Sequence, residues 1–225
     1  MKKITQSTCC YCGVGCGVLI ESENDQITGV RGDPTHPANA GRLCTKGATL
    51  DKTVQRSRST GLRVPIPWES ALDEASTRFA DIIRQHGPDS VAFYISGQLL
   101  TEDYYVFNKL AKGLIGTNNV DTNSRLCMSS AVAGYKETLG ADAPPCSYED
   151  IAAAELIFIA GANPAVAHPI VFRRIEDARA ANPELKIIVA DPRRSETAEI
   201  ADLQMALTPG RHIALYNGML QVLNA

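Results

Sequence analysis

The sequence lacks any long apolar run, any block of like charge and any excess of basic residues. No stretch reaches the roughly 20 apolar residues that a transmembrane helix needs, so we expect no membrane partner. Lys and Arg total 22 and Asp and Glu total 25, and this slightly acidic balance predicts no nucleic-acid partner. The composition is that of an ordinary globular protein.

The N-terminus also lacks the marks of an exported protein. The opening segment MKKITQSTCC has two lysines with no apolar segment behind them, and it contains no twin-arginine pattern. We therefore expect a cytoplasmic location. Disulfides are rare there, and clustered cysteines more often bind metal or take part in catalysis.

What the sequence does have is a dense group of cysteines. Four of its seven cysteines lie between positions 9 and 16, interleaved with glycine. Cys9, Cys12 and Cys16 form a C-x2-C-x3-C motif, and Cys44 follows after a long gap. Four thiolates can hold a zinc ion or an iron–sulfur cluster, but structural zinc usually uses two C-x2-C pairs. Three ligands on one loop and one distant ligand therefore favour a [4Fe–4S] cluster, with buried metal-free thiols as the weaker alternative.

The remaining cysteines carry less information. Cys10 and Cys146 lack ligand spacing, and a free cysteine usually behaves as a small buried hydrophobe. Cys127 follows an apparent turn and precedes a run of small residues that predicts a helix. A helix N-terminus stabilises a thiolate, so Cys127 is a candidate nucleophile or metal ligand, with a packed core cysteine as an equal alternative.

Hydrophobic patterning divides the chain into two predicted domains. Two short apolar runs within 17–33 predict a β-hairpin, and the polar, proline-containing segment 51–67 predicts a boundary. We therefore expect a small domain over 1–60 and a larger one over 61–225.

The larger domain alternates between helical and strand patterns. Strands are expected at 91–95, 156–159 and 186–189, and helices at 68–83, 101–115, 169–181 and 213–223. This order predicts an α/β fold in which an open, mostly parallel sheet carries helices on both faces.

Taken together, these motifs resemble the molybdopterin oxidoreductases of the dimethyl-sulfoxide-reductase superfamily. The resemblance rests on the C-x2-C-x3-C motif, on Cys-Thr-Lys-Gly at 44–47 and on Ser-Arg-Leu-Cys-Met at 124–128. It covers essentially the whole chain and is closest to the bacterial assimilatory nitrate reductases. Such enzymes continue for several hundred residues more, so we expect this chain to be the N-terminal part of one.

The resemblance implies that the small domain is a [4Fe–4S] domain. In it, Cys9, Cys12, Cys16 and Cys44 match the cluster ligands, and Lys46 matches a lysine between cluster and pterin that helps electrons pass.

The resemblance also implies that the larger domain is an incomplete molybdopterin-dinucleotide-binding domain. Cys127 matches the protein ligand of a molybdenum that is bound as a bis(molybdopterin guanine dinucleotide) cofactor. Further positions match cofactor contacts: Gln98, Asn123, Gly161, Asn163, Pro164, Asp191, Arg193 and Gly210. One position departs from the family pattern, because His212 stands where Pro-Gly-x-Asp has its aspartate, and this puts one guanosine contact in doubt.

The implied activity is the reduction of nitrate to nitrite, with electrons passing from the cluster to molybdenum. A ferredoxin, a flavodoxin or a flavin-containing NADH-linked protein is the expected donor. One alternative is a formate dehydrogenase, although its metal-ligating residue is typically followed by histidine and here Met128 follows Cys127. Another is a non-catalytic iron–sulfur electron-transfer fragment.

Overall fold

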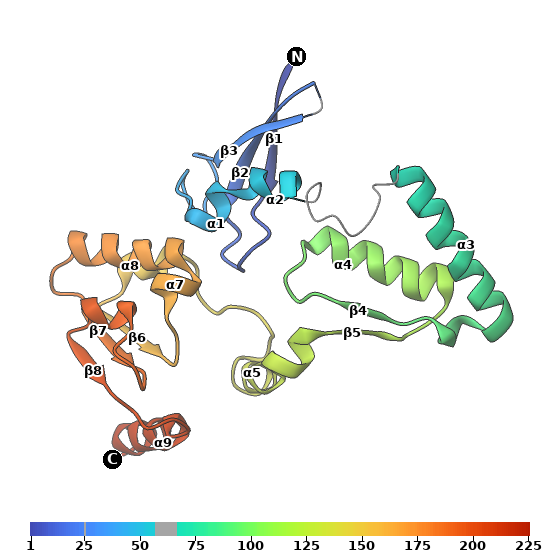
Figure 1. Cartoon of the computed structure of the whole chain (residues 1–225). Coiled ribbons are helices and arrows are strands. Elements are labelled where there is room, and N and C mark those ends of the chain that lie inside the picture. The colour runs from blue at the N-terminus through green and yellow to red at the C-terminus, as the bar shows by residue number, and fades with distance from the viewer. Residues whose placement is uncertain (25, 57–66) are drawn as a thin grey trace. The chain divides into compact units, whose positions relative to one another are not determined.

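The computed structural model describes residues 1–24, 26–56 and 67–225, without the side chains of 54–56. Its residues group into two compact units (Figure 1). The first unit combines 1–26, 30–48 and 146–225, and the second combines 27–29 and 49–145. Each unit is described by itself below.

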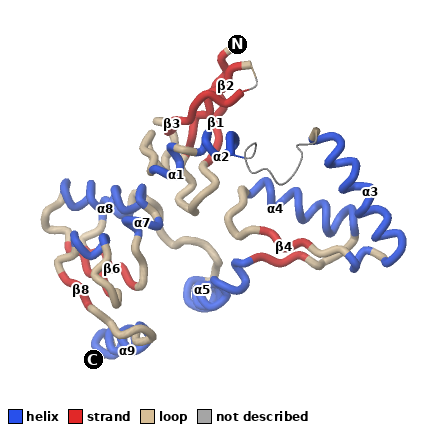
Figure 2. Tube along the Cα trace, viewed as in Figure 1, coloured by secondary structure: helices blue, strands red, loops and turns tan. Residues whose placement is uncertain are grey.

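The chain begins with a three-stranded sheet in the order β1-β2-β3 (Figure 2). β2 (Gly17–Glu23) and β3 (Gln26–Gly32) confirm the predicted hairpin. β1 (Lys2–Thr8) was not expected, because its mostly polar sequence shows no buried face, and six of its seven residues are exposed. It pairs antiparallel with β2 in a register that runs from Lys2 opposite Glu23 to Thr8 opposite Gly17. Backbone hydrogen bonding, which sequence periodicity does not report, therefore places this strand.

The C-terminal part of the first unit is built on a parallel three-stranded sheet. Its strands are β6 (Leu156–Ala160), β7 (Lys186–Ala190) and β8 (Leu203–Met205), in that order. Helix α8 (Pro169–Ala181) connects β6 to β7, as expected of a parallel pair. One apolar core joins the helix to the sheet and contains Ile159, Ile175, Ala178, Leu185, Ile187, Val189 and Ala198.

The second unit contains a two-stranded parallel sheet formed by β4 (Phe93–Ile95) and β5 (Val120–Thr122). The predicted helix before it is α3 (Trp68–His86), which ends at Gly87 with a φ of 80°. The Phe93 ring on β4 lies 6.0 Å from the Phe79 ring of α3 and 5.6 Å from the Phe107 ring of α4 (Thr101–Asn108). These ring pairs hold both helices against the strand.

The remaining elements are helices, and all of them except α5 and α9 are short. They are α1 (Thr45–Ala48), α2 (Leu50–Arg56), η1 (Pro88–Ser90), η2 (Lys109–Ile115), α5 (Asn123–Leu139), α6 (Asp150–Ala153), α7 (Pro164–Ala167), η3 (Glu196–Ile200) and α9 (His212–Leu223). In the part of the chain that the structure describes, no helix is both long enough and apolar enough to cross a membrane.

The predicted α/β class is confirmed, with antiparallel strands first and then parallel strands and helices. Among the described residues the parallel strands form two sheets, β4-β5 and β6-β7-β8, where one sheet had been expected. Of the predicted boundary 51–67, residues 51–56 belong to helix α2, and 57–66 lie outside the described residues.

Ile187 is the residue whose truncation should destabilise the first unit most clearly. Its side chain, on the second residue of β7, is fully buried in the apolar core, so Ile187→Ala should lower the free energy of unfolding by about 2–5 kcal/mol. Leu203→Ala on β8 is the control. Leu203 is half exposed, so its truncation should lower the free energy of unfolding by about 1 kcal/mol or less. Urea unfolding followed by circular dichroism measures both, and equal losses would show that β7 is not the core strand.

Candidate functional site

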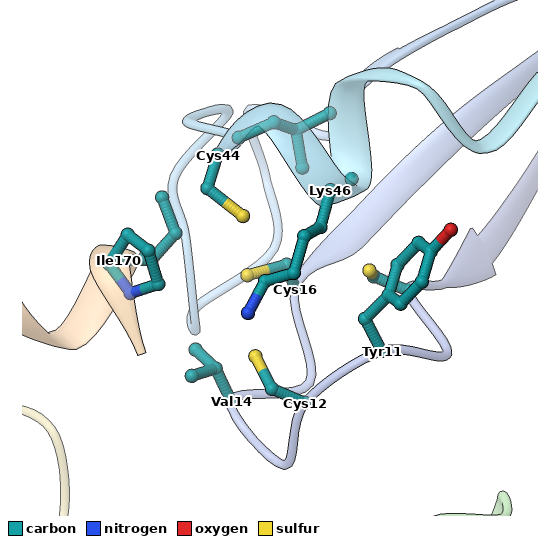
Figure 3. Close-up of a pocket in the computed structure, with 11 residues that line it drawn as sticks. Tyr11, Cys12, Val14, Cys16, Cys44, Lys46 and Ile170 are labelled. Carbon is teal, nitrogen blue, oxygen red and sulfur yellow. The ribbon is translucent and has the colours of Figure 1, made fainter. Parts of the chain in front are cut away.

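The four predicted cluster ligands line one pocket in the first unit. The residues around this cysteine pocket are Cys9, Tyr11, Cys12, Val14, Cys16, Leu43, Cys44, Lys46, Gly47, Pro169 and Ile170. Figure 3 shows the sulfurs of Cys12, Cys16 and Cys44 pointing toward the same space. In the described ranges, no three His, Cys, Asp or Glu side chains are grouped tightly enough to hold a single metal ion. A four-iron cluster presents a separate iron to each cysteine and needs that wider arrangement.

The pairing of β1 with β2 closes the base of the cysteine loop. The last pair in the register is Thr8 opposite Gly17, and the next backbone bond runs from the Cys9 N–H to the Cys16 carbonyl oxygen at 2.8 Å. This bond brings Cys9 and Cys16 together at the mouth of a tight loop. Gly15 has a φ of 71°, a left-handed conformation in which a side chain would be strained.

Asn39 joins the Cys44 segment to this loop. Its side chain is 2% exposed, and its Oδ1 accepts a hydrogen bond from the Gly17 N–H at 2.8 Å. Its Nδ2 donates to the carbonyl oxygens of Gly17 at 3.1 Å and Arg42 at 2.8 Å. Gly17 adjoins Cys16 and Arg42 lies two residues before Cys44, so one amide spans both cysteine segments. Sequence reasoning missed Asn39, because asparagine at such a position more often indicates a turn.

The electrostatics of the pocket favour neutral thiols until positive charge is present. Burial raises the pKa of the Cys16 thiol to about 11, and repulsion from Cys9, Cys12 and Cys44 adds to the effect. Burial likewise raises the pKa of Cys9, partly opposed by a backbone hydrogen bond from Tyr11. Only thiolates bind metal, so a bound cation would displace the protons and remove the repulsion between sulfurs. The residues present fit a cationic, thiolate-bound group.

Cys10 and Cys146 take no part in the pocket. Both side chains are exposed, so the expectation that they would be buried small hydrophobes is wrong. Cys10 lies in the tight loop, between the pocket cysteines Cys9 and Cys12, and its side chain is exposed.

Lys46 lies on α1, two residues after Cys44, and lines the same pocket. Its Nζ donates to the Ala167 carbonyl oxygen at 3.1 Å, at the end of helix α7. Helix α7 begins at Pro164, directly after the predicted cofactor residues Gly161 and Asn163. Lys46 therefore connects the cysteine pocket to the segment that follows β6. Its predicted place between a cluster and a pterin stays a prediction.

The structure gathers five predicted cofactor positions at the carboxyl ends of β6 and β7, which we call the β6–β7 edge. They are Gly161, Asn163, Pro164, Asp191 and Arg193. The Gly161 N–H donates to the Ala190 carbonyl oxygen at 2.9 Å, which ties the first turn to β7. Asn163 accepts from the Thr197 hydroxyl at 2.7 Å, and its amide donates to Glu196 at 2.8 Å. An Asp191 carboxylate oxygen accepts from the Arg193 N–H at 2.8 Å.

His212 also faces the β6–β7 edge. A Cβ added at Gly161 would lie 3.5 Å from the His212 Nε2, and Gly210, with a φ of 84°, allows the turn before it. Among the described side chains, the buried polar atoms without a hydrogen-bond partner are this Nε2 and the Ser195 Oγ. Ser195 is only 5% exposed and precedes the Glu196 and Thr197 that bind Asn163. Sequence reasoning missed Ser195, because only the fold shows that its hydroxyl is buried unpaired.

In the second unit, the remaining predicted positions meet where β4 and β5 end. The Asn123 Oδ1 accepts from the Gly97 N–H at 2.6 Å, so Asn123 lies beside the loop that carries Gln98. Gly97 is required here, because a Cβ would come within 2.1 Å of the Ser124 Oγ. Cys127 is exposed on α5, one turn after Asn123 on the same face. The sequence had placed Cys127 before the predicted helix. In the structure the helix already begins at Asn123, so Cys127 lies inside its first turns.

The chain matches two protein-family models. Residues 2–56 match the molybdopterin oxidoreductase Fe4S4 domain, and residues 53–225 match molybdopterin oxidoreductase. The cysteine pocket takes its loop and Cys44 from the first match. The β6–β7 edge and Cys127 belong to the second.

Two nitrate reductases are similar to nearly the whole of this chain. A nitrate reductase from Klebsiella oxytoca is 51% identical over 231 residues, which cover 98% of this chain and 26% of that protein. A periplasmic nitrate reductase from Desulfovibrio desulfuricans is 45% identical over 232 residues, which cover 99% of this chain and 31% of that protein. The chain thus spans between a quarter and a third of the length of these relatives.

A solved structure shares the fold. Acetylene hydratase from Pelobacter acetylenicus superposes with a TM-score of 0.71 over 96% of this chain and 31% of its own, at 24% sequence identity. At this identity the likeness shows the arrangement of the backbone and leaves the activity to other evidence.

Asn39→Ala should loosen the connection between the two cysteine segments. The change leaves the Gly17 N–H and the Arg42 carbonyl oxygen without this partner, whereas the Gly17 carbonyl oxygen keeps its bond from the Asp33 N–H. Each unpaired buried group costs about 1–3 kcal/mol. Hydrogen exchange at the Gly17 amide should therefore accelerate about tenfold or more. The matched control is Asn182→Ala, whose exposed side chain accepts one bond from the Glu184 N–H. Unchanged Gly17 exchange in Asn39→Ala would contradict the bridging role.

Proposed function

The chain belongs to the molybdopterin oxidoreductases, and on this basis we propose that it is the N-terminal part of a molybdenum-dependent nitrate reductase. The reaction is the reduction of nitrate by two electrons and two protons to nitrite and water. The observation that carries the proposal is the cysteine pocket, in a chain 51% identical over nearly all its length to a nitrate reductase.

We assign Cys9, Cys12, Cys16 and Cys44 as the ligands of a [4Fe–4S] cluster. The donor set supports this assignment, because four soft thiols surround one space, and burial together with the neighbouring cysteines raises the pKa of Cys9 and Cys16. The β1–β2 register and the Asn39 amide hold the two cysteine segments together. When bound, the cluster supplies one-electron transfer to the molybdenum cofactor.

Lys46 is assigned the position between the cluster and the pterin. Its stem lines the cysteine pocket, while its ammonium group donates to Ala167 beside the β6–β7 edge. A cation there lowers the energy of additional negative charge on either side. In this position Lys46 would favour the passage of electrons between the cluster and the pterin.

We propose the guanine dinucleotide form of the molybdopterin cofactor. Two sets of strand-end residues support it: the β6–β7 edge in the first unit, and Gln98 with Asn123 in the second. Parallel α/β sheets bind nucleotides outside the carboxyl ends of their strands. The unpaired Ser195 hydroxyl and His212 nitrogen are polar groups that a nucleotide would satisfy. Where the family pattern has an acidic contact, His212 brings a nitrogen donor or acceptor.

Cys127 is assigned as the protein ligand of molybdenum. Its thiol is exposed on α5 and stands one helical turn from Asn123, at the end of β5. Thiolate is a suitable donor for a soft, redox-active metal.

A further part of the proposal concerns the role of the enzyme, its compartment and its electron donor. We propose an assimilatory enzyme in the cytoplasm that takes electrons from a ferredoxin, a flavodoxin or a flavin-containing NADH-linked protein. One relative, from Haloferax mediterranei, is named an assimilatory nitrate reductase, and another is named periplasmic. Fractionation of cells that express the whole protein decides the location.

Two alternatives make different predictions. A formate dehydrogenase would oxidise formate, and Met128 after Cys127 disfavours it. A non-catalytic iron–sulfur fragment would bind the cluster and turn over neither substrate. Assays with nitrate and with formate on the same preparation of the whole enzyme separate the three.

Cys12→Ala should abolish the cluster. The variant removes one of four thiols from the pocket, and metal binding contributes to the folding of such small domains. Anaerobic reconstitution, with iron and sulfide counted and the reduced sample examined by electron paramagnetic resonance, measures the loss. Cys10→Ala is the matched control, because this neighbouring thiol is exposed outside the pocket and its removal should leave about four irons bound. An intact cluster in Cys12→Ala would refute the ligand assignment.

Cys127→Ala should abolish nitrate turnover in the whole enzyme and leave the cluster's resonance spectrum unchanged. The reason is that Cys127 is assigned to molybdenum alone, while the cluster has its own four ligands. Cys146→Ala, which removes another exposed thiol, is the control and should retain activity. If Cys127→Ala reduced nitrate at the parent rate, another residue would have to bind the metal.

A further inference from the structure

The cysteine loop is held by a residue that lies far outside the cluster domain in sequence. The Tyr148 hydroxyl donates a hydrogen bond of 2.8 Å to the carbonyl oxygen of Val14, which lies between Cys12 and Cys16. Val14 is 5% exposed, so this carbonyl has little water to replace the tyrosine. All of these residues belong to the first unit.

Arg174 on α8 holds the Tyr148 ring in place. The guanidinium carbon lies 5.1 Å from the centre of the ring, within the range of a cation–π contact. The same guanidinium donates to the Ala38 carbonyl oxygen from Nε at 3.2 Å and from Nη2 at 2.9 Å, and it also contacts the Pro37 carbonyl. Arg174 therefore ties α8 to the segment that carries Asn39.

Apolar contacts close the same side of the pocket. Ile170, one turn before Arg174 on α8, is 2% exposed and packs with Val14 and Cys16 in one apolar cluster. Tyr148 and Val171 pack against this cluster as partly buried neighbours. Residues of the larger domain thus supply one wall of the cysteine pocket.

We propose that Tyr148 and Arg174 are positioning residues for the iron–sulfur cluster, an inference that rests on the ligand assignment proposed above. The bond to Tyr148 fixes the direction of the Val14 carbonyl. A trans peptide points its N–H opposite to its carbonyl, so the same bond fixes the direction of the Gly15 N–H. Gly15, which lacks a side chain and has a φ of 71°, offers little resistance to rotation of this peptide.

The consequence concerns water and charge at the cluster. Without the hydroxyl, the buried Val14 carbonyl has no donor where it stands, so we expect the loop to turn until water can reach this carbonyl. Hydrogen bonds and solvent exposure set the potential of such clusters, and better hydration favours the more negative, reduced state. The bond from Tyr148 therefore lowers the reduction potential and slows the loss of the cluster.

The test is Tyr148→Phe in the full chain, reconstituted anaerobically with iron and sulfide. This change keeps the ring under Arg174 and removes only the hydroxyl. The net free energy of one hydrogen bond corresponds to a factor of about two to ten in an equilibrium or rate constant. A chelator should therefore remove the cluster from the variant faster by about that factor. The reduction potential, followed by resonance during a redox titration, should become more positive. Arg174→Lys, which keeps the charge but loses the planar fork, should change both quantities in the same direction.

Tyr104→Phe is the matched control. The Tyr104 hydroxyl also donates to a backbone carbonyl, that of Ser96 at 2.8 Å, but this carbonyl lies in the second unit and outside the cysteine loop. Loss of the Tyr104 hydroxyl should leave the lifetime and the reduction potential of the cluster unchanged.

The possible outcomes separate the two proposals. A Tyr148→Phe chain with the parent lifetime and potential, even if it melts earlier, would overturn the positioning role while the ligand assignment stood. Equal effects from Tyr104→Phe would overturn it as well. A parent chain that binds no iron under these conditions would overturn the ligand assignment and the positioning role together.

Discussion

The register between β1 and β2 is the constraint on which the cysteine pocket, the proposed cluster site, depends. Because Thr8 pairs with Gly17, the next backbone bond joins Cys9 to Cys16, and the loop between them is closed at its base. A shift of one residue would turn every side chain of β1 to the opposite face and separate these two cysteines. The strand that sets this register is itself exposed and polar, so its pairing is held by backbone hydrogen bonds and not by a buried face.

Around this closed loop, neutral polar side chains perform most of the positioning. Asn39 spans the two ligand segments, and Tyr148 fixes the carbonyl in the middle of the loop. This choice has a physical reason, because the pocket already concentrates four thiols that repel one another as thiolates and an added carboxylate would increase that repulsion. The cations of this region, Lys46 and Arg174, donate to carbonyl oxygens at its border.

The nucleotide-type positions follow a different rule, because parallel strands present their carboxyl ends at one edge. Gly161 and Asp191 follow neighbouring strands and are held together through Ala190, while Gln98 and Asn123 follow the paired strands β4 and β5. The two units thus repeat one device, a short parallel pair followed by a glycine-containing turn and a helix. Loops placed this way can differ in sequence while the strands keep their backbone in position.

Local sequence was enough to predict the features that depend on near neighbours. The C-x2-C-x3-C motif, the hairpin within 17–33, helix α3 with its glycine stop and the α/β class all follow from spacing and periodicity over a few residues. The family matches confirm the resemblance that these motifs carried. The residue assignments at the site stay predictions.

Only the tertiary structure revealed the residues that act over long separations in sequence. Tyr148 lies 134 positions from the carbonyl it binds, and Asn39 lies 22 positions from Gly17. Neither residue carries a spacing or a period that points to its partner, and the unpaired hydroxyl of Ser195 is visible only once its surroundings are packed. The sequence by itself determined which side chains can bind a cluster and a nucleotide cofactor. Folding decided what holds them, because hydrogen bonds between distant segments depend on the path of the whole chain.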